Sequence, residues 1–318
     1  MKFLAAILLL LTLLSCIREP KPDRAKSLPV AETASRMQEL VVSLSKYAKK
    51  RSPGFLIVPQ NASKLLYIGG DPYASRHPEY ANSIDALGIE GLFYSGAYEP
   101  DSLRIAILDT FSKQKKVFVA DYVKDNSDVP KNRAMIKKHG FIPFVRSREN
   151  FDYVKIPKHS GTGLPPGGIG GVSDYLYLIN GSQYPDKEHF IQAVSQSRYQ
   201  MAIIDLFFHE EAFTRSEVER MKRMPSGGNR IVLGYVNIGA AENWRYYWNL
   251  SWKIGSPEFL ARPYHGYKDE AWVHFWDPEW KKILFGNPGG YLDRLIDSGF
   301  DGAYLDNVEA YLYLYAPD

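Results

Sequence analysis

Several acidic residues in this chain follow directly after short apolar runs, where chemistry is common in α/β proteins. They are Glu90, Asp121, Asp205, Asp277 and Asp306. The residues at the carboxyl ends of the strands form the active site of an α/β barrel. Two carboxyl groups in one cleft can hydrolyse a glycosidic bond: one attacks or stabilises the anomeric carbon, and the other protonates the leaving oxygen. This arrangement of acids predicts a carboxylate-based hydrolase.

The sequence lacks the residue patterns of metal sites, phosphate-binding loops and serine hydrolases. The histidines show no close pairing of the kind that binds zinc, and Cys16 is the only cysteine, so we expect no metal site and no cofactor. The chain has no glycine-rich phosphate loop between a strand and a helix. It also has no G-x-S-x-G elbow of a serine hydrolase.

Aromatic residues make up 14% of the chain, and all six tryptophans fall between positions 244 and 280. They occur at intervals of four, at Trp244, Trp248 and Trp252 and again at Trp272, Trp276 and Trp280. Two interpretations stay open for them. The spacing fits packing along one helix face, and flat rings beside carboxylates also suit stacking against sugars.

The elements that must position these residues alternate between strands and helices. Nine apolar runs are candidate strands, at residues 55–58, 84–89, 117–120, 141–145, 175–179, 201–204, 231–238, 273–276 and 303–305. Amphipathic stripes or a capping box predict helices over residues 37–47, 103–111 and 214–223. This alternation predicts an α/β fold, a single-domain (β/α)8 TIM barrel, with one of the nine runs peripheral.

The first 31 residues indicate export. Lys2 precedes an apolar run over residues 3–14 that is too short to cross a bilayer, and a small residue precedes Cys16. This layout resembles a bacterial lipoprotein signal over residues 1–16 with lipidation of Cys16; the alternative is an ordinary signal peptide with an incidental cysteine. Residues 17–31 are rich in proline and charge and predict a tether. We expect an exported protein, either anchored to a membrane by lipid or secreted.

The remaining chain, residues 32–318, has the size of one barrel. The net charge is +3, from 39 basic and 36 acidic residues, so nucleic acid is not an expected partner. We expect a monomer. Residues 160–173 contain six glycines and two prolines and predict a linker, not a helix or a central strand.

Three motifs carry a family resemblance. The segments "RIVLGYVNIGAAENWRYYW" at 230–248, "WVHFWDPEW" at 272–280 and "GFDGAYLDN" at 299–307 resemble the endo-α-1,4-polygalactosaminidases of glycoside hydrolase family 114. The resemblance covers residues 172–310 and implies a barrel that degrades a galactosamine-containing polysaccharide.

The order of segments differs from that family. Residues 37–61, 83–96 and 116–123 resemble family segments that follow the Asp306 strand. We therefore interpret the chain as a circular permutant, in which the linker joins the ends found elsewhere and the chain's own ends open the loop after the fifth strand. Barrel ends lie close together, so a short linker can bridge them at small entropic cost. The alternative is a damaged gene with coincidental similarity at its front.

The resemblance also implies catalytic roles: Asp306 as nucleophile and Glu90 as general acid/base. Glu90 then needs a raised pKa, and its neighbours Ile89, Leu92 and Phe93 are expected to supply apolar surroundings. Alternative roles are a salt-bridged strand-end carboxylate for Glu90 and a helix N-cap for Asp306.

Further residues are candidate substrate contacts. Asp205, Asp121 and Asp277 would favour a cationic amino sugar, and Asn61 and Tyr235 follow or lie within strands. Glu242 and Arg245 are further candidates, although their spacing also fits a structural ion pair. A carbohydrate-binding lipoprotein without turnover, or a surface adhesin, would be compatible with the same barrel.

Overall fold

The computed structural model describes residues 28–157, 161–164 and 167–315. The predicted signal peptide with Cys16 and most of the predicted tether lie outside these residues. The first helix, α1, spans Val30–Arg51, so the last two residues assigned to the tether are helical. None of the helices in the described ranges is both long enough and apolar enough to cross a membrane.

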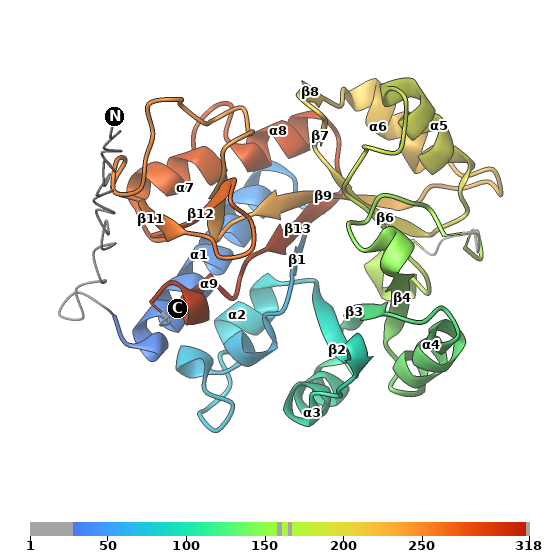
Figure 1. Cartoon of the computed structure of the whole chain (residues 1–318), viewed down its shortest axis with the longest axis horizontal. Coiled ribbons are helices and arrows are strands. Elements are labelled where there is room, and N and C mark those ends of the chain that lie inside the picture. The colour runs from blue at the N-terminus through green and yellow to red at the C-terminus, as the bar shows by residue number, and fades with distance from the viewer. Residues whose placement is uncertain (1–27, 158–160, 165–166, 316–318) are drawn as a thin grey trace, which may run out of the picture.

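Eight parallel strands in the described ranges form the centre of the fold (Figure 1). Five pair in the order β1 (Leu56–Pro59), β13 (Gly302–Asp306), β9 (Ile231–Asn237), β6 (Met201–Asp205) and β5 (Leu176–Leu178). Three more pair in the order β2 (Ala86–Tyr98), β3 (Lys116–Val123) and β4 (Ile142–Ser147). The prediction of an α/β fold with parallel strands is confirmed.

The two sheets meet where β1 passes β2. A parallel bridge pairs Gln60 with Gly88, and the Asn61 N–H donates to the Gly88 carbonyl at 2.8 Å. At the other end of the order, β4 and β5 share no backbone pairing in the described part of the chain. Their side chains do meet, because the rings of Phe144 and Tyr177 lie 6.4 Å apart.

The eighth of the nine predicted strands, residues 273–276, is the peripheral one. The observed strand β12 (Glu270–Val273) pairs antiparallel with β10 (Ala240–Glu242) and β11 (Leu260–Pro263), outside the parallel sheets. Consequently β13 is the fourth parallel strand after the linker. We expected the chain to end after the fifth barrel strand that follows the linker; in the structure it ends after the fourth.

The predicted helices are present. The stripe at 37–47 lies in α1, which buries Met37, Leu40 and Val41, and the stripe at 103–111 lies in α3 (Ser102–Phe111). In α6 (Arg215–Lys222) the predicted capping box is formed: the Glu217 N–H donates to Thr214 Oγ1 at 3.4 Å, and the Thr214 N–H donates to the Glu217 carboxylate at 2.7 Å. The other helices are α2 (Pro78–Ser83), α4 (Asp128–Lys138), α5 (Lys187–Gln196), α7 (Pro278–Leu284), α8 (Tyr291–Asp297) and α9 (Ala310–Tyr313). A short hairpin follows β6; its strands, β7 (Phe207–Phe208) and β8 (Glu211–Ala212), have two residues each.

The helix-face interpretation of the tryptophans was wrong. Only Trp280 lies in a helix, α7, where it is buried and donates its Nε1–H to the Ile238 carbonyl at 3.0 Å. Trp272 lies in β12, and the others lie in turns and loops. The interval of four between the tryptophans therefore does not reflect a helix, because the segment between β9 and β13 consists mainly of turns, loops and an antiparallel sheet.

The two ends of the described chain lie side by side (Figure 1). Helix α9 packs against α1, and Thr33 Oγ1 donates a hydrogen bond to the Tyr311 carbonyl at 2.8 Å. Between β4 and β5 the described linker residues form no strand and only one 3-10 turn, Ile169–Gly171. Thr162 ties this segment to the start of β5 through the Asp174 carboxylate, at 2.6 Å from its N–H.

Candidate active site

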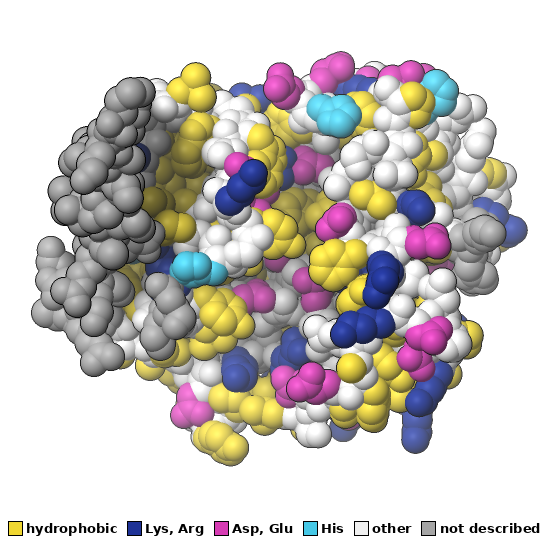
Figure 2. All heavy atoms as spheres, in the orientation of Figure 1, with side chains coloured by type: hydrophobic (Ala, Val, Ile, Leu, Met, Phe, Trp, Pro, Cys, Tyr) yellow, Lys and Arg dark blue, Asp and Glu magenta, His cyan; other side chains and the backbone are white. Residues whose placement is uncertain are grey.

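A cavity of ≈ 540 Å³ lies at the carboxyl ends of the parallel strands. Glu90 of β2, Tyr235 of β9, Asp205 of β6 and Asp306 of β13 all line it, together with Gln60, which directly follows β1. Figure 2 shows the hollow near the middle of this face, with acidic side chains around it. The strands bring these residues together because their carboxyl ends share one rim.

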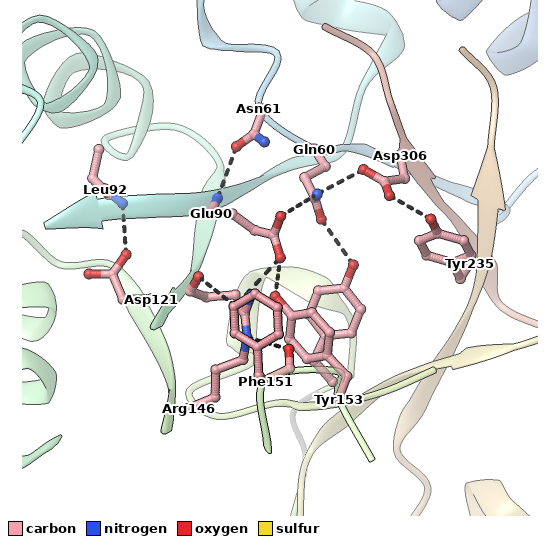
Figure 3. A network of polar contacts seen from close by, with 12 residues as sticks. Gln60, Asn61, Glu90, Leu92, Asp121, Arg146, Phe151, Tyr153, Tyr235 and Asp306 are labelled. Carbon is pink, nitrogen blue, oxygen red and sulfur yellow. Dashed lines mark hydrogen bonds and ion pairs between the residues drawn. The ribbon is translucent and has the colours of Figure 1, made fainter. Parts of the chain in front are cut away.

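One amide group links the two predicted catalytic acids (Figure 3). Gln60 Nε2 donates to Glu90 Oε2 at 3.0 Å and to Asp306 Oδ1 at 2.8 Å. The orientation of this amide is fixed, because its Oε1 accepts a hydrogen bond from the Tyr177 hydroxyl at 3.0 Å and the side chain is buried. Two oxygens bonded to the same nitrogen are less than about 6 Å apart.

Asp306 is held by three donors. Besides Gln60, the Tyr235 hydroxyl donates to Oδ2 at 2.5 Å and the Asn307 N–H donates to Oδ1 at 2.7 Å. Burial, followed by the charge of Glu90, raises the pKa of Asp306 to about 7, although the hydrogen bonds from Tyr235 and Asn307 act to lower it. This carboxyl group therefore titrates in the neutral range.

The helix N-cap role considered for Asp306 was wrong. Helix α9 begins only at Ala310, and Glu309 occupies the N-cap position. Asn307 follows Asp306 in the left-handed conformation, with φ 53°, so the chain turns away before the helix starts. The Asp306 side chain lines the cavity.

Glu90 has polar surroundings. Its carboxylate accepts hydrogen bonds from the Gln60 amide and the Tyr153 hydroxyl, and it lies 3.6 Å from Arg146 Nη1. The expected apolar setting is absent because β2 bends after Glu90, so Leu92 and Phe93 are buried away from the cavity. The salt bridge considered as an alternative does exist, and it lies within the cavity.

Two further glutamates in the cavity were missed by sequence reasoning. Burial and the charge of Asp306 raise the pKa of Glu309 to about 8. Burial and the charges of Glu242 and Asp306 raise the pKa of Glu270 to about 8. Glu309 lies two residues after the third motif and three after Asp306, and this closeness was a usable signal. Glu270 lies in β12 and had no such signal.

Arg245 joins two other predicted contacts. Its guanidinium lies 2.8 Å from Asp205 Oδ2, and its Nε donates to Glu242 Oε2 at 2.7 Å. All three residues line the cavity, and Arg245 is only 7% exposed. The structural ion pair considered for Glu242 and Arg245 is therefore present at the wall of the site. Burial raises the pKa of Glu242, although Arg245 acts to lower it.

Three predicted contacts lie outside the cavity. Asp121 is fully buried, and its carboxylate accepts backbone N–H bonds from Leu92 at 2.7 Å and from Phe93 and Tyr94 at 3.1 Å. Asp277 caps α7 by accepting the Glu279 N–H. These roles for Asp121 and Asp277 were wrong, because backbone donors already occupy both carboxylates.

Asn61 does not line the cavity but supports two residues that do. Its Oδ1 accepts the Glu90 N–H at 2.9 Å, and its Nδ2 donates to Glu309 Oε1 at 2.6 Å. The predicted substrate contact at Asn61 is therefore replaced by a positioning contact.

Aromatic side chains form much of the remaining wall. They come from the loop after β4, from β7 and from the segment between β9 and β13, and are Phe151, Tyr153, Phe207, Trp244, Tyr264 and Tyr267. Trp244 is 51% exposed and is the single tryptophan on the cavity wall formed by the described residues. No group of three His, Cys, Asp or Glu side chains in the described ranges is arranged to hold a metal ion.

Comparison with known proteins finds similarity for the later part of the chain. Residues 183–316 match the glycoside-hydrolase family GH114. An uncharacterized protein of Thermotoga maritima is 38% identical over 125 residues, which cover 38% of this chain and 36% of that protein. Uncharacterized proteins of Methanocaldococcus jannaschii and Deinococcus radiodurans are each 32% identical over similar lengths.

The chain spans about a third of the length of the curated relatives it matches. The matched region contains Asp205, Tyr235, Arg245 and Asp306, whereas Gln60 and Glu90 precede it. The strands that supply the nucleophile candidate and the Arg245 cluster thus lie in the part of this chain, residues 183–316, that is similar to glycoside-hydrolase family GH114.

Proposed function

We propose that this protein hydrolyses glycosidic bonds within an amino-sugar polysaccharide, with Asp306 as the nucleophile and Glu90 as the general acid/base. The observation that carries the proposal is the Gln60 amide, which holds one oxygen of each carboxyl group within 3.0 Å of the same nitrogen. A glycoside hydrolase requires such a pair of carboxyl groups in one cleft.

The separation of the two acids supports a double displacement. Carboxyl groups are about 5 Å apart in retaining enzymes and clearly farther apart in inverting enzymes, which need room for a water molecule. In the first step the Asp306 carboxylate attacks the anomeric carbon while Glu90 gives its proton to the leaving oxygen, and a glycosyl ester forms. In the second step Glu90 takes a proton from water, whose oxygen attacks the anomeric carbon and releases Asp306.

The pKa of the nucleophile bears on the pH at which the protein works. Burial and the charge of Glu90 raise the pKa of Asp306 to about 7. The attacking carboxylate must be ionised, so we expect hydrolysis to require a pH near or above neutral.

The charge of the cavity favours a cationic substrate. Seven acidic side chains line it, namely Glu90, Asp152, Asp205, Glu242, Glu270, Asp306 and Glu309, against two arginines, Arg146 and Arg245. An ammonium group on the sugar would be attracted to those of these side chains that are ionised, and it would favour ionisation of Asp306, Glu270 and Glu309, whose pKa values are raised. Galactosamine units are the substrate we propose, in line with the family resemblance of the three motifs.

We also propose that the eight strands form one circularly permuted barrel. The pairing order, the β1–β2 junction and the Phe144–Tyr177 contact support a ring that closes between β4 and β5. The contact between α1 and α9 supports an opening of the chain after β13, and the linker joins β4 to β5.

Export with a lipid anchor remains part of the proposal. The apolar run before Cys16 supports it. Expression of the full chain in a bacterium tests it: Cys16→Ser should move the protein from the membrane fraction to the soluble fraction, and an unchanged distribution would contradict lipidation of Cys16.

Reducing-end release from an α-1,4-linked galactosamine polymer tests the activity. We expect release by the native protein and a fall of about a thousandfold in the Asp306→Asn and Glu90→Gln variants. Asp277→Asn is the matched control and should keep full activity, because Asp277 caps α7 outside the cavity. Binding of the polymer without release would favour the non-catalytic carbohydrate-binding protein.

A further inference from the structure

A second cavity, of ≈ 580 Å³, adjoins the first at Glu90. Three residues, Glu90, Arg146 and Phe151, line both cavities and so form the ridge between them. Figure 3 shows Arg146 and Phe151 beside Glu90, away from Asp306 and Tyr235. Asp306 lines only the first cavity.

The walls of the second cavity are held in place. Arg104 forms an ion pair with Asp101 at 2.9 Å, and its two terminal nitrogens donate to the carbonyls of Glu90 and Gly91 at 3.1 and 2.7 Å. This arrangement fixes the bend of β2 directly after Glu90. The groove is therefore a formed surface of the fold.

The side chains of the second cavity suit a sugar ring. Tyr122 and Phe151 meet edge to face with their centroids 4.9 Å apart, and Arg146 lies over the Phe151 ring at 5.4 Å. Aromatic faces bind the apolar faces of ligands, and nearby polar groups orient them. Ser95 and Glu99 line the same cavity and are exposed, so they can meet hydroxyl or amino groups.

We propose that the second cavity binds the sugar units on the leaving-group side of the bond that is cleaved. This inference rests on the proposed hydrolase activity. The sugar attacked at its anomeric carbon must lie beside Asp306, hence in the first cavity. The glycosidic oxygen must lie at Glu90, which borders both cavities, so the chain beyond that oxygen continues into the second.

Hydrolysis of galactosamine oligomers of increasing length tests this inference. The native protein should show a kcat/KM that rises as units are added on the leaving-group side. Ser95→Trp should fill the groove, and Tyr122→Ala should remove its aromatic face. Each variant should lose about tenfold in kcat/KM on the longest oligomer, while the shortest cleaved oligomer is affected little.

Matched controls lie outside both cavities. Ser216→Trp adds the same bulk at an exposed site on α6, and Tyr73→Ala removes an exposed ring; both should behave as the native protein does. If the native protein cleaves the oligomers and the groove variants keep its dependence on length, the second cavity is not a sugar site, although the hydrolase proposal survives. If the native protein cleaves none of them, both proposals are wrong.

Discussion

At the scale of single residues, the site depends on an uncharged side chain between two acids. Gln60 can donate to both Glu90 and Asp306 only because the Tyr177 hydroxyl fixes the amide in that direction. A hydrogen bond to a carboxylate favours its ionised form. Gln60 therefore holds the two carboxyl groups close together and supplies a hydrogen bond to each.

Replacement of this amide should change the pH dependence of hydrolysis. In Gln60→Leu, Asp306 loses a donor, so its pKa rises and the acidic limb of the kcat profile moves to higher pH. We expect kcat to fall about a hundredfold at neutral pH. Gln114→Leu, an exposed glutamine outside the cavity, is the control. An unchanged pH profile in Gln60→Leu would show that the bridge has no catalytic role.

The buried acids also predict how stability depends on pH. The pKa values of Asp306, Glu270 and Glu309 are raised to about 7, 8 and 8 in the fold, whereas in the unfolded chain these groups release their protons near pH 4. Between these limits the folded protein holds more protons, so its free energy of unfolding falls as pH rises from about 4 to about 8 and then levels off.

Removing one of these acids should reduce the loss of unfolding free energy between about pH 4 and about pH 8. Glu309→Gln should raise the free energy of unfolding at about pH 8.5 by on the order of 1 to 2 kcal/mol and change it little at about pH 4. Urea denaturation at several pH values measures this, with Glu39→Gln, exposed on α1, as the control. Equal effects at both pH values would mean that Glu309 is not held protonated in the fold.

At the scale of elements, the junction between β1 and β2 decides where Glu90 lies. Gly88 is two residues before Glu90 and lies against Tyr304 of β13, so closely that an added Cβ would be 2.0 Å from the Tyr304 hydroxyl oxygen. Glycine is required here because the ring fills the space that a side chain would need. The junction therefore tolerates no extra atom without moving β2.

Gly88→Ala should thus destabilise the fold and disturb the site. Overpacking of this kind costs about 1–3 kcal/mol, and the displacement of β2 should lower kcat as well. Thermal unfolding and reducing-end release measure the two effects. Gly54→Ala is the control, because a Cβ there would meet nothing within 4 Å. A Gly88→Ala protein with native stability would contradict the tight junction.

At the scale of the whole molecule, the chain order itself can be tested. Helix α9 lies against α1, so a short connection can join the two ends, and the linker between β4 and β5 can be opened instead. We expect this reordered protein, which begins near residue 167 and ends near residue 157, to fold with a similar free energy of unfolding and to keep its activity. Failure of the reordered chain to fold would contradict the proposed permutation.

The sequence predicted the parts of the site that depend on strand ends. Asp205 and Asp306 end parallel strands, and Glu90 ends the predicted strand at 84–89 and lies where the pairing of β2 with β3 is interrupted. The carboxyl ends of these strands share one rim, so the meeting of the three acids in a cavity follows from the predicted strands. Asp121 also follows a predicted strand but does not reach the cavity. The reason is that β2 bends at Gly91, with φ 58°, and its pairing with β3 is interrupted there. The backbone N–H groups freed by the bend are satisfied by the Asp121 carboxylate.

The rest of the wall could not be predicted from strand patterns. Tyr264, Tyr267 and Glu270 belong to the segment between β9 and β13. They reach the cavity only because β10, β11 and β12 of this segment fold into an antiparallel sheet beside it. That sheet depends on pairings between segments that are distant in the sequence, and the local pattern of apolar residues does not predict such pairings. The same pairings removed residues 273–276 from the parallel strands.

The stereochemistry of the first product tests the close pairing of Glu90 and Asp306 most directly. Proton NMR of a freshly started reaction on an α-linked galactosamine oligomer distinguishes the two anomers before they interconvert. With one oxygen of Glu90 and one oxygen of Asp306 held less than about 6 Å apart by Gln60, the new reducing end should be the α anomer. Initial formation of the β anomer would contradict the double displacement at Asp306, and so would the absence of any product.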